Sequence, residues 1–208
     1  LVALTRIDLV EDTEMIELCR DEIEELVEAL PDDVLFVLDE AYSEYQDEPV
    51  DLRPLIAKGK KVFCTRTFSK IYGLAGLRVG YGYGDPELVS LLNRARAPFN
   101  VNSVALAASR AALEDQGFVS SCRTANAAGL RYFVECVESL NIEYIPSSAN
   151  FITLNVDDGN AAFEAMQRER IIVRPLAAYG MSQWIRVSVG TEEHNELAIK
   201  SLTSFLRR

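Results

Sequence analysis

The apolar positions of the chain follow two spacings, which predict helices and buried strands. From Glu14 to Leu30 apolar residues recur at every third or fourth position, as in an amphipathic helix, and Pro31 then interrupts the pattern. Val34 to Leu38 is instead a continuous apolar run of strand length. Such a run is typical of a strand that is buried on both faces of a parallel sheet.

Further along, short apolar runs alternate with longer helical patterns. Strands are predicted over residues 61–65 and 77–83, and helices over residues 86–94, 102–113 and 118–140. In the last third, strands are predicted over residues 150–156, 171–173 and 184–189, with helices over residues 161–170 and 192–206. Gln46 to Pro54 is expected to be a polar loop. Thr191 is expected to cap the last helix, since its hydroxyl can accept a hydrogen bond from a free backbone N–H.

The order of these elements predicts an α/β protein with two domains. We expect residues 1–117 to form part of a large domain, a mostly parallel sheet with helices, and residues 118–208 to form a smaller α+β domain. A chain of 208 residues is long enough to bury a sizeable core.

Composition and charge exclude several classes of partner. Hydrophobic residues make up 49% and charged residues 25% of the chain, as in ordinary globular proteins, and no apolar run approaches the ~20 residues that span a bilayer. The net charge of -11 argues against nucleic acid or an anionic membrane as the main partner. The four cysteines include no C-x-x-C pair, and we expect reduced thiols in the cytoplasm.

Lys70 stands in the segment with the most informative chemistry. Two small hydroxyl residues, Thr67 and Ser69, precede it closely. A lysine in a partly desolvated, electropositive site loses its proton more easily and becomes a nucleophile toward an aldehyde. Most lysines are solvated surface residues. The apolar neighbours Phe68 and Ile71 favour the reactive interpretation here.

Arg78 lies eight residues after Lys70 and is expected to open a strand behind the flexible Gly73 and Gly76. A guanidinium and hydroxyl groups are suitable donors to a phosphate dianion. An arginine at a strand end also commonly forms a surface ion pair. The nearby lysine favours phosphate binding.

Asp39 ends the apolar run, and ligands of open α/β sheets bind beyond the carboxyl ends of the strands. A carboxylate there would keep a pyridine nitrogen protonated, so Asp39, Lys70 and Arg78 together predict a pyridoxal 5'-phosphate (PLP) site. Alternatively, Asp39 is a turn or cap residue. Tyr42 is a candidate donor to the phenolic oxygen of PLP or an amphipathic boundary tyrosine. Glu40 is expected to be a structural carboxylate.

Arg186 lies inside an apolar strand pattern, where a charged side chain must be paired or face a cavity. We expect it to bind a substrate carboxylate or phosphate, with Arg174 as a weaker candidate of the same kind. His194 is expected to be a solvated residue near a helix start. One histidine and no cysteine pair argue against a zinc or iron site. Ser69 and Ser188 lack the G-x-S-x-G context of a hydrolase nucleophile.

With these residues the chain resembles the fold-type I PLP-dependent aminotransferases and, within that group, is most similar to histidinol-phosphate aminotransferases. The resemblance runs from about residue 20 to the end of the chain, in five ordered blocks. These blocks are residues 37–42, 66–70, 73–81, 149–151, and 172–176 leading into 186–190.

The resemblance implies PLP-dependent amino transfer between histidinol phosphate and 2-oxoglutarate, in histidine biosynthesis, by a cytoplasmic homodimer. It implies that Lys70 binds the cofactor aldehyde and later moves a proton. It further implies ring contacts by Asp39 and Tyr42. The residues implied to bind the cofactor phosphate are Thr67, Ser69 and Arg78, and those implied to bind substrate are Arg186 and Arg174.

The chain departs from the family at its start. The family's N-terminal half supplies a glycine-containing phosphate turn, an aromatic residue that stacks on the cofactor, and an Asn-Pro-Asn-Asn-Pro-Thr-Gly segment, and residues 1–14 contain none of these. We therefore expect a fragment of a longer enzyme, with weak or no activity alone. Alternatives with the same fold are an aromatic aminotransferase, a phosphothreonine decarboxylase, or a non-catalytic effector or dimerisation module.

Overall fold

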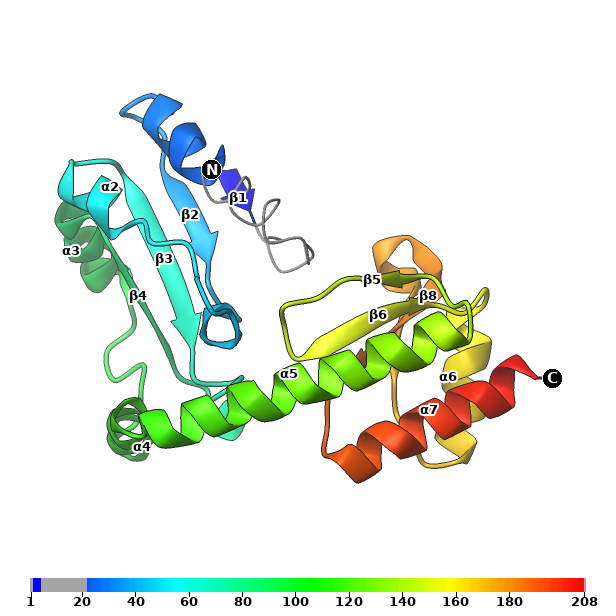
Figure 1. Cartoon of the computed structure of the whole chain (residues 1–208). Helices are drawn as coiled ribbons and strands as arrows, with labels where there is room; N and C mark the ends of the chain where they lie inside the picture. Colours follow the sequence, from blue (N-terminus) through cyan, green and yellow to red (C-terminus); the bar gives the residue numbers. More distant parts are fainter. Residues whose placement is uncertain (1, 5–21, 208) are drawn as a thin grey trace. The chain divides into compact units, whose positions relative to one another are not determined.

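The computed structural model describes residues 2–4 and 22–207, which divide into two compact units (Figure 1). Unit 1 is Leu1–Ser121 and unit 2 is Cys122–Arg208. The division falls within helix α5 (Gln116–Ser139). Each unit has its own sheet.

The sheet of unit 1 has four strands in the order β1-β2-β3-β4. They are β1 (Val2–Leu4), β2 (Phe36–Asp39), β3 (Val62–Thr67) and β4 (Gly80–Gly84). The first three are mutually parallel and β4 is antiparallel to β3. The predicted mostly parallel sheet is therefore confirmed.

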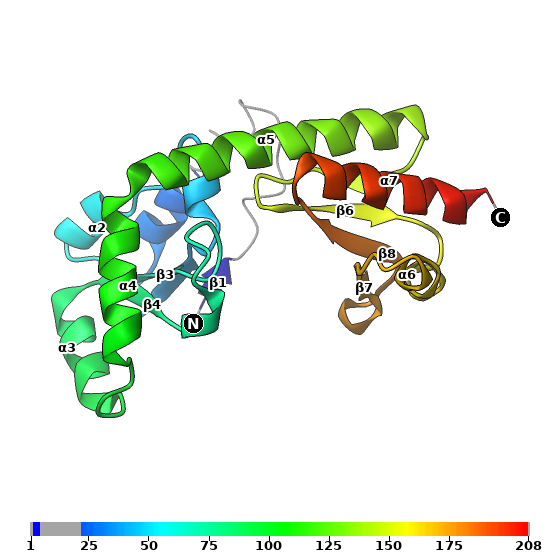
Figure 2. The ribbon, with the colours of Figure 1, turned by 90° about the horizontal axis from the view of Figure 1, so that it is seen from below.

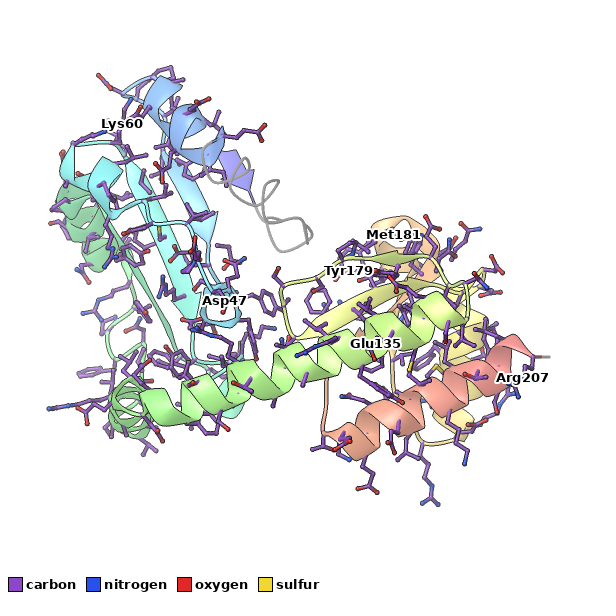
Figure 3. All side chains as sticks on the ribbon, viewed as in Figure 1. Asp47, Lys60, Glu135, Tyr179, Met181 and Arg207 are labelled. Atoms are coloured by element: carbon purple, nitrogen blue, oxygen red, sulfur yellow. The ribbon has the colours of Figure 1, made fainter. Side chains whose placement is uncertain are left out.

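Helices cover one face of this sheet. Residues 22–29 are helical, and the short α2 (Arg53–Ala57) follows β2. Apolar residues of these two segments and of the loop before α2 pack with those of β2 and β3 into one buried cluster, whose members are Ile23, Val27, Phe36, Leu38, Val50, Leu52, Leu55, Val62 and Cys64. Lys60, labelled in Figure 3, donates hydrogen bonds to the carbonyl oxygens of Glu28 (2.6 Å) and Leu30 (3.2 Å). A cation there stabilises the end of the 22–29 helix.

Three helices continue the chain from β4. α3 (Pro86–Ala95) begins with proline at its first position, and the side chain of Asp85 caps it through the amide of Leu88. α4 (Ser103–Glu114) is capped in the same way by Asn102, and α5 follows almost directly. These caps satisfy backbone N–H groups that have no partner inside the helix.

Unit 2 is an antiparallel sheet with helices on one face (Figure 2). Its strands are β5 (Tyr144–Ile145), β6 (Phe151–Asn155), β7 (Arg174–Leu176) and β8 (Met181–Ser188), in the order β5-β6-β8-β7. The helices are the second part of α5, α6 (Gly159–Arg168) and α7 (Glu192–Leu206). Their buried residues form one cluster with Ile152 and Leu154 of β6 and Ile185 and Val187 of β8.

Several sequence-based predictions need correction. Residues 171–173 are not a strand, since β7 begins at Arg174. Arg78 does not open a strand, because it directly follows the 3-10 turn η3 (Ala75–Leu77) and β4 begins at Gly80. The expected loop at Gln46–Pro54 runs into the start of α2. The predicted helix from Glu14 lies outside the described residues up to residue 21.

Among the helices of the described residues, none has both the length and the apolar character that crossing a membrane requires.

Candidate active site

The alternation of side chains along β2 and β3 places two different sets of polar residues on opposite faces of the unit 1 sheet. Asp39 pairs in register with Thr65, and Leu38 with Cys64. Directly paired residues share a face, and successive residues face opposite sides. Asp39, Thr65 and Thr67 therefore share one face, and the next residue in sequence after Asp39, Glu40, turns toward the face of the buried cluster.

Asp39 is exposed at the carboxyl end of β2. Its Oδ1 atom accepts hydrogen bonds from the amide of Ala41 (3.1 Å) and from the hydroxyl of Thr65 (3.3 Å). These bonds fix one carboxylate oxygen and orient the side chain at the strand end. The position matches the sequence-based expectation that Asp39 would stand at the edge where open α/β sheets bind ligands.

Lys70 lies in the turn that follows β3. Phe68, Ile71 and Tyr72 are buried at 3%, 2% and 8% relative exposure, so they anchor the turn on both sides of the lysine. The Nζ atom of Lys70 lies 4.8 Å from the ring centroid of Tyr42. The structure thus brings the predicted nucleophile close to the predicted donor to the phenolic oxygen, although the two residues are far apart in sequence.

The hydroxyl and guanidinium groups expected at a phosphate also gather at this turn. The Thr67 hydroxyl accepts a hydrogen bond from the Ser69 amide at 3.0 Å. Arg78 adopts a left-handed backbone conformation (φ 51°), and its NH1 atom donates to the Ala75 carbonyl oxygen at 2.9 Å and to the Ser69 hydroxyl at 3.5 Å. Arg78 is exposed, so its remaining donors are available to an anion.

Two glycines of β4 lie on the face that carries Asp39 and Thr67, where their neighbours approach closely. Gly80 pairs with Thr67 and Gly82 with Thr65, so both lie on this face. A Cβ atom at Gly82 would lie 2.3 Å from Cζ of Phe63, and one at Gly80 would lie 2.6 Å from the Arg66 carbonyl oxygen. A larger residue at these positions would have to displace its neighbours.

The opposite face carries a charged network that the sequence analysis missed. Arg66 Nε donates to Glu40 Oε2 at 2.8 Å, and the Tyr83 hydroxyl donates to the same oxygen at 2.8 Å. Burial, followed by the hydrogen bond to Glu40, raises the pKa of Tyr83. Burial alone would lower the pKa of Arg66, but the hydrogen bond and the charge of Glu40 raise it. Both groups therefore remain protonated at neutral pH.

In unit 2, two arginines emerge side by side on the open face of the sheet. Arg174 of β7 pairs directly with Arg186 of β8. The Arg174 guanidinium donates to the hydroxyl of Tyr179 (labelled in Figure 3) at 2.6 Å, and that of Arg186 lies 4.8 Å from the ring centroid of Phe151. Neither arginine forms an ion pair with a carboxylate among residues 22–207. Like charges in direct register repel, which an anion between them would relieve.

Comparisons with known proteins identify the family of the chain. The aminotransferase class I and II family matches residues 17–202, and the chain belongs to this family. Members of the family are PLP-dependent enzymes.

Several curated relatives of the chain are histidinol-phosphate aminotransferases. Histidinol-phosphate aminotransferase 1 of Nitrosococcus oceani is 47% identical over 190 residues, which cover 89% of this chain and 51% of that protein. The histidinol-phosphate aminotransferase of Akkermansia muciniphila is 41% identical, covering 90% of this chain and 52% of that protein. The chain thus spans about half the length of the curated relatives it matches.

Solved structures show the fold-type I aminotransferase fold. The histidinol-phosphate aminotransferase of Sinorhizobium meliloti, crystallised with pyridoxal-5'-phosphate, superposes with a TM-score of 0.79 at 27% identity, over 90% of this chain and 53% of that chain. The L-threonine-O-3-phosphate decarboxylase of Porphyromonas gingivalis superposes with a TM-score of 0.77 at 28% identity, over 91% of this chain and 60% of that chain.

Proposed function

We propose that this chain is the PLP-binding and C-terminal part of a histidinol-phosphate aminotransferase, which exchanges an amino group between histidinol phosphate and 2-oxoglutarate. Unit 1 is the partial PLP-binding domain and unit 2 the small domain. The observation that carries the proposal is the turn after β3, where Lys70 stands between buried anchors beside Tyr42, Ser69 and Arg78. The identity to two histidinol-phosphate aminotransferases supports the substrate assignment.

The side chains of unit 1 fit PLP in number and chemistry. Asp39 is an exposed carboxylate for the ring nitrogen, and Tyr42 lies next to Lys70 as a donor for the phenolic oxygen. The phosphate would be held by three groups of one turn, Thr67, Ser69 and Arg78. A guanidinium with hydroxyl and backbone donors is the usual protein environment of a phosphate.

Once bound, PLP supplies a ring that withdraws electrons from the substrate's Cα. The chain's own part is to hold and move protons at fixed atoms. Lys70 Nζ would bind the cofactor aldehyde covalently and, when displaced by substrate, carry the proton to and from Cα. Asp39 would hold a proton at the ring nitrogen through its charge.

We assign Arg186 and Arg174 to the acidic end of the substrate. Their direct register places two guanidinium groups on one face of the unit 2 sheet. Contacts with the rings of Phe151 and Tyr179 hold them. Two adjacent guanidinium groups suit a phosphate dianion, and one suits the carboxylate of 2-oxoglutarate. The presence of two adjacent guanidinium groups, rather than one, favours a phosphorylated amino donor.

We further propose that the complete enzyme is a cytoplasmic homodimer acting on small molecules, without nucleic acid or membrane as partners. The free thiols of Cys64, Cys122 and Cys136 support a reducing compartment. The net charge of -11 disfavours polyanionic partners.

A phosphothreonine decarboxylase is the second candidate function, because the Porphyromonas gingivalis enzyme shares the fold at 28% identity. It would use the same cofactor residues and the same phosphate-binding arginines. Assaying the complete enzyme for carbon dioxide release from phosphothreonine and for amino transfer from histidinol phosphate separates the two, since the loss of carbon dioxide requires a carboxylate on the substrate's Cα.

The proposal is tested by titrating the chain with PLP and recording the visible absorbance of the parent, Lys70→Ala and the control Lys61→Ala. We expect a saturable imine band in the parent and in Lys61→Ala, because Lys61 is exposed at the start of β3, and no such band in Lys70→Ala. A band that Lys70→Ala leaves unchanged, or a parent without a band, would overturn the assignment of this site.

A further inference from the structure

We propose that Glu40 is a positioning residue, whose ion pair with Arg66 on the core side of the unit 1 sheet sets the spacing of Asp39 and Lys70 on the other side. The inference rests on the proposed PLP site, because it concerns the side chains assigned to hold that cofactor.

The ion pair is buried and directional. The Glu40 side chain is 4% exposed and that of Arg66 is 25% exposed, with 2.8 Å between Nε and Oε2. Tyr83 of β4 donates to the same carboxylate oxygen at 2.8 Å, and the Arg66 guanidinium lies 5.8 Å from its ring centroid. Glu40 therefore connects the end of β2 to both β3 and β4.

This contact lies where the regular pairing of the strands stops. β2 pairs with β3 as far as Asp39 and Thr65, and the amide of Glu40 donates to the Thr65 carbonyl oxygen at 2.8 Å. Beyond that bond the chain leaves the ladder for the turn η2 (Ser43–Tyr45). The Thr65 hydroxyl also donates to Asp39 on the other face at 3.3 Å, and Arg66 NH1 lies 3.8 Å from Glu44 Oε1. The Glu40–Arg66 pair is the shortest of these side-chain contacts, so we assign it the main part in holding the two strand ends together.

Each member of the pair is one residue away from a proposed cofactor contact. Glu40 follows Asp39, and Arg66 precedes Thr67, the start of the segment that leads to Lys70. Because side chains alternate across a strand, a shift of the pair on one face moves Asp39 and Thr67 on the other. The spacing between Asp39 and Lys70 is thus coupled to an ion pair on the opposite face of the sheet from the proposed cofactor.

The Glu40–Arg66 ion pair is better explained as a contact that positions the strand ends than as a contribution to folding stability. A buried ion pair can often be replaced by apolar residues without loss of stability, because desolvation offsets the attraction. Glu40 also has one buried oxygen, Oε1, without a hydrogen-bond partner among the described residues. An apolar pair would continue the cluster of Leu38 and Cys64. Such a replacement would remove the directional contact between the ends of β2 and β3.

The test uses the double variant Glu40→Leu/Arg66→Met, the single variant Glu40→Gln and the control Asp51→Asn. The control removes one charge from the exposed Asp51–Arg53 pair. For each protein, the melting temperature and the PLP dissociation constant from the absorbance titration are measured. We expect the double variant to bind PLP roughly tenfold or more weakly, since small misplacements of reacting groups are costly. Its melting temperature should also fall, because the Tyr83 hydroxyl loses its acceptor and Glu44 loses its contact with Arg66. Asp51→Asn should match the parent in both.

A second measurement needs no cofactor. Hydrogen exchange is followed at the amides of Gly73 and Leu74, which donate to the carbonyl oxygens of Lys70 and Phe68 and close the turn that carries the lysine. We expect faster exchange there in the double variant and in Glu40→Gln, with unchanged exchange in the unit 2 strands.

The two measurements distinguish failure of this inference from failure of the proposed function. A parent that lacks the PLP band would overturn the proposed function, while exchange would still decide whether Glu40 positions the turn. Unchanged exchange, or a double variant that binds PLP as tightly as the parent, would show that Glu40 is only structural.

Discussion

Asp39 and Glu40 are adjacent carboxylates with opposite surroundings. Asp39 is exposed and accepts two hydrogen bonds at a strand end, whereas Glu40 is buried against a guanidinium and a phenol. A strand sends successive side chains to opposite faces, so one residue of separation is enough to leave one carboxylate exposed and to place the other in the core. A register shift of one residue would exchange these roles.

Cys64 gives a prediction at the scale of a single side chain. It is fully buried, and this burial, with the charge of Glu40 as a smaller cause, raises the pKa of its thiol from 9.0 to about 11. A rise of two units leaves about a hundredfold less thiolate near pH 8. We expect iodoacetamide to modify the partly exposed Cys122 and Cys136 while sparing Cys64, as read by peptide mass spectrometry.

The raised pKa of the Cys64 thiol also determines how its contribution to folding stability depends on pH. Because the folded pKa is the higher one, the neutral thiol's contribution to stability is present below pH 9.0 and is lost as the pH rises through about 11. Cys64 should be labelled freely in denaturant, which controls for its reactivity. Labelling of Cys64 in the folded chain at the rate of Cys122 would contradict its placement.

At the scale of elements, Gly159 illustrates how closely a helix approaches a sheet. It is the first residue of α6, capped by Asp158. A Cβ atom there would lie 2.5 Å from the carbonyl oxygen of Trp184 and 3.0 Å from that of Ser182, both in the backbone of β8. Since neither can move without shifting the strand, we expect Gly159→Ala to lower the free energy of unfolding by about 1–3 kcal/mol, measured by urea denaturation.

Gly117→Ala is the matched control. It lies in the first turn of α5, and its added Cβ would meet only Asp115 Oδ1, at an ordinary 3.6 Å. Alanine is the better helix former by about 0.5–1 kcal/mol, so this variant should be as stable as the parent or slightly more stable. Equal stability of the two variants would mean that α6 does not pack on β8 as described.

Elements with strong local signals could be predicted from the sequence, and those set by tertiary contacts could not. α7 begins and ends as predicted, because Thr191 caps it and its apolar spacing is regular. The apolar run at residues 171–173 looked like a strand. However, Arg170 takes a left-handed conformation and the Ile171 amide donates to the Met166 carbonyl oxygen, so these residues end α6.

The same distinction holds for the site. The Lys70 turn was recognisable because its hydroxyls, glycines and arginine are contiguous in sequence. The bond between Arg66 and Glu40 joins residues 26 positions apart and depends on the register of β2 with β3. No local pattern encodes that register, so Glu40 could be assigned only as a structural carboxylate before its partner was known.

At the scale of the whole molecule, net charge and exposed apolar side chains have opposite effects on self-association. The net charge of -11 favours separate molecules in solution. Against this, α3, α4 and the residues next to them leave many large apolar side chains in contact with water. These are Leu91 (47% exposed), Leu92 (42%), Phe99 (98%), Val104 (66%), Leu106 (57%), Leu113 (43%) and Phe118 (47%). Large exposed apolar side chains on consecutive elements are candidates for a surface that associates.

We therefore expect reversible self-association of the chain, and we expect Phe99→Lys/Val104→Lys to weaken it. Two added lysines change the net charge from -11 to -9, which by itself would reduce repulsion and favour association. Weaker association of the variant must then come from the lost apolar surface. Sedimentation velocity over a dilution series gives the association constant. Ile172→Lys, at a 78% exposed position in unit 2, is the control. An unchanged constant in the double variant would exclude the α3–α4 surface as the contact.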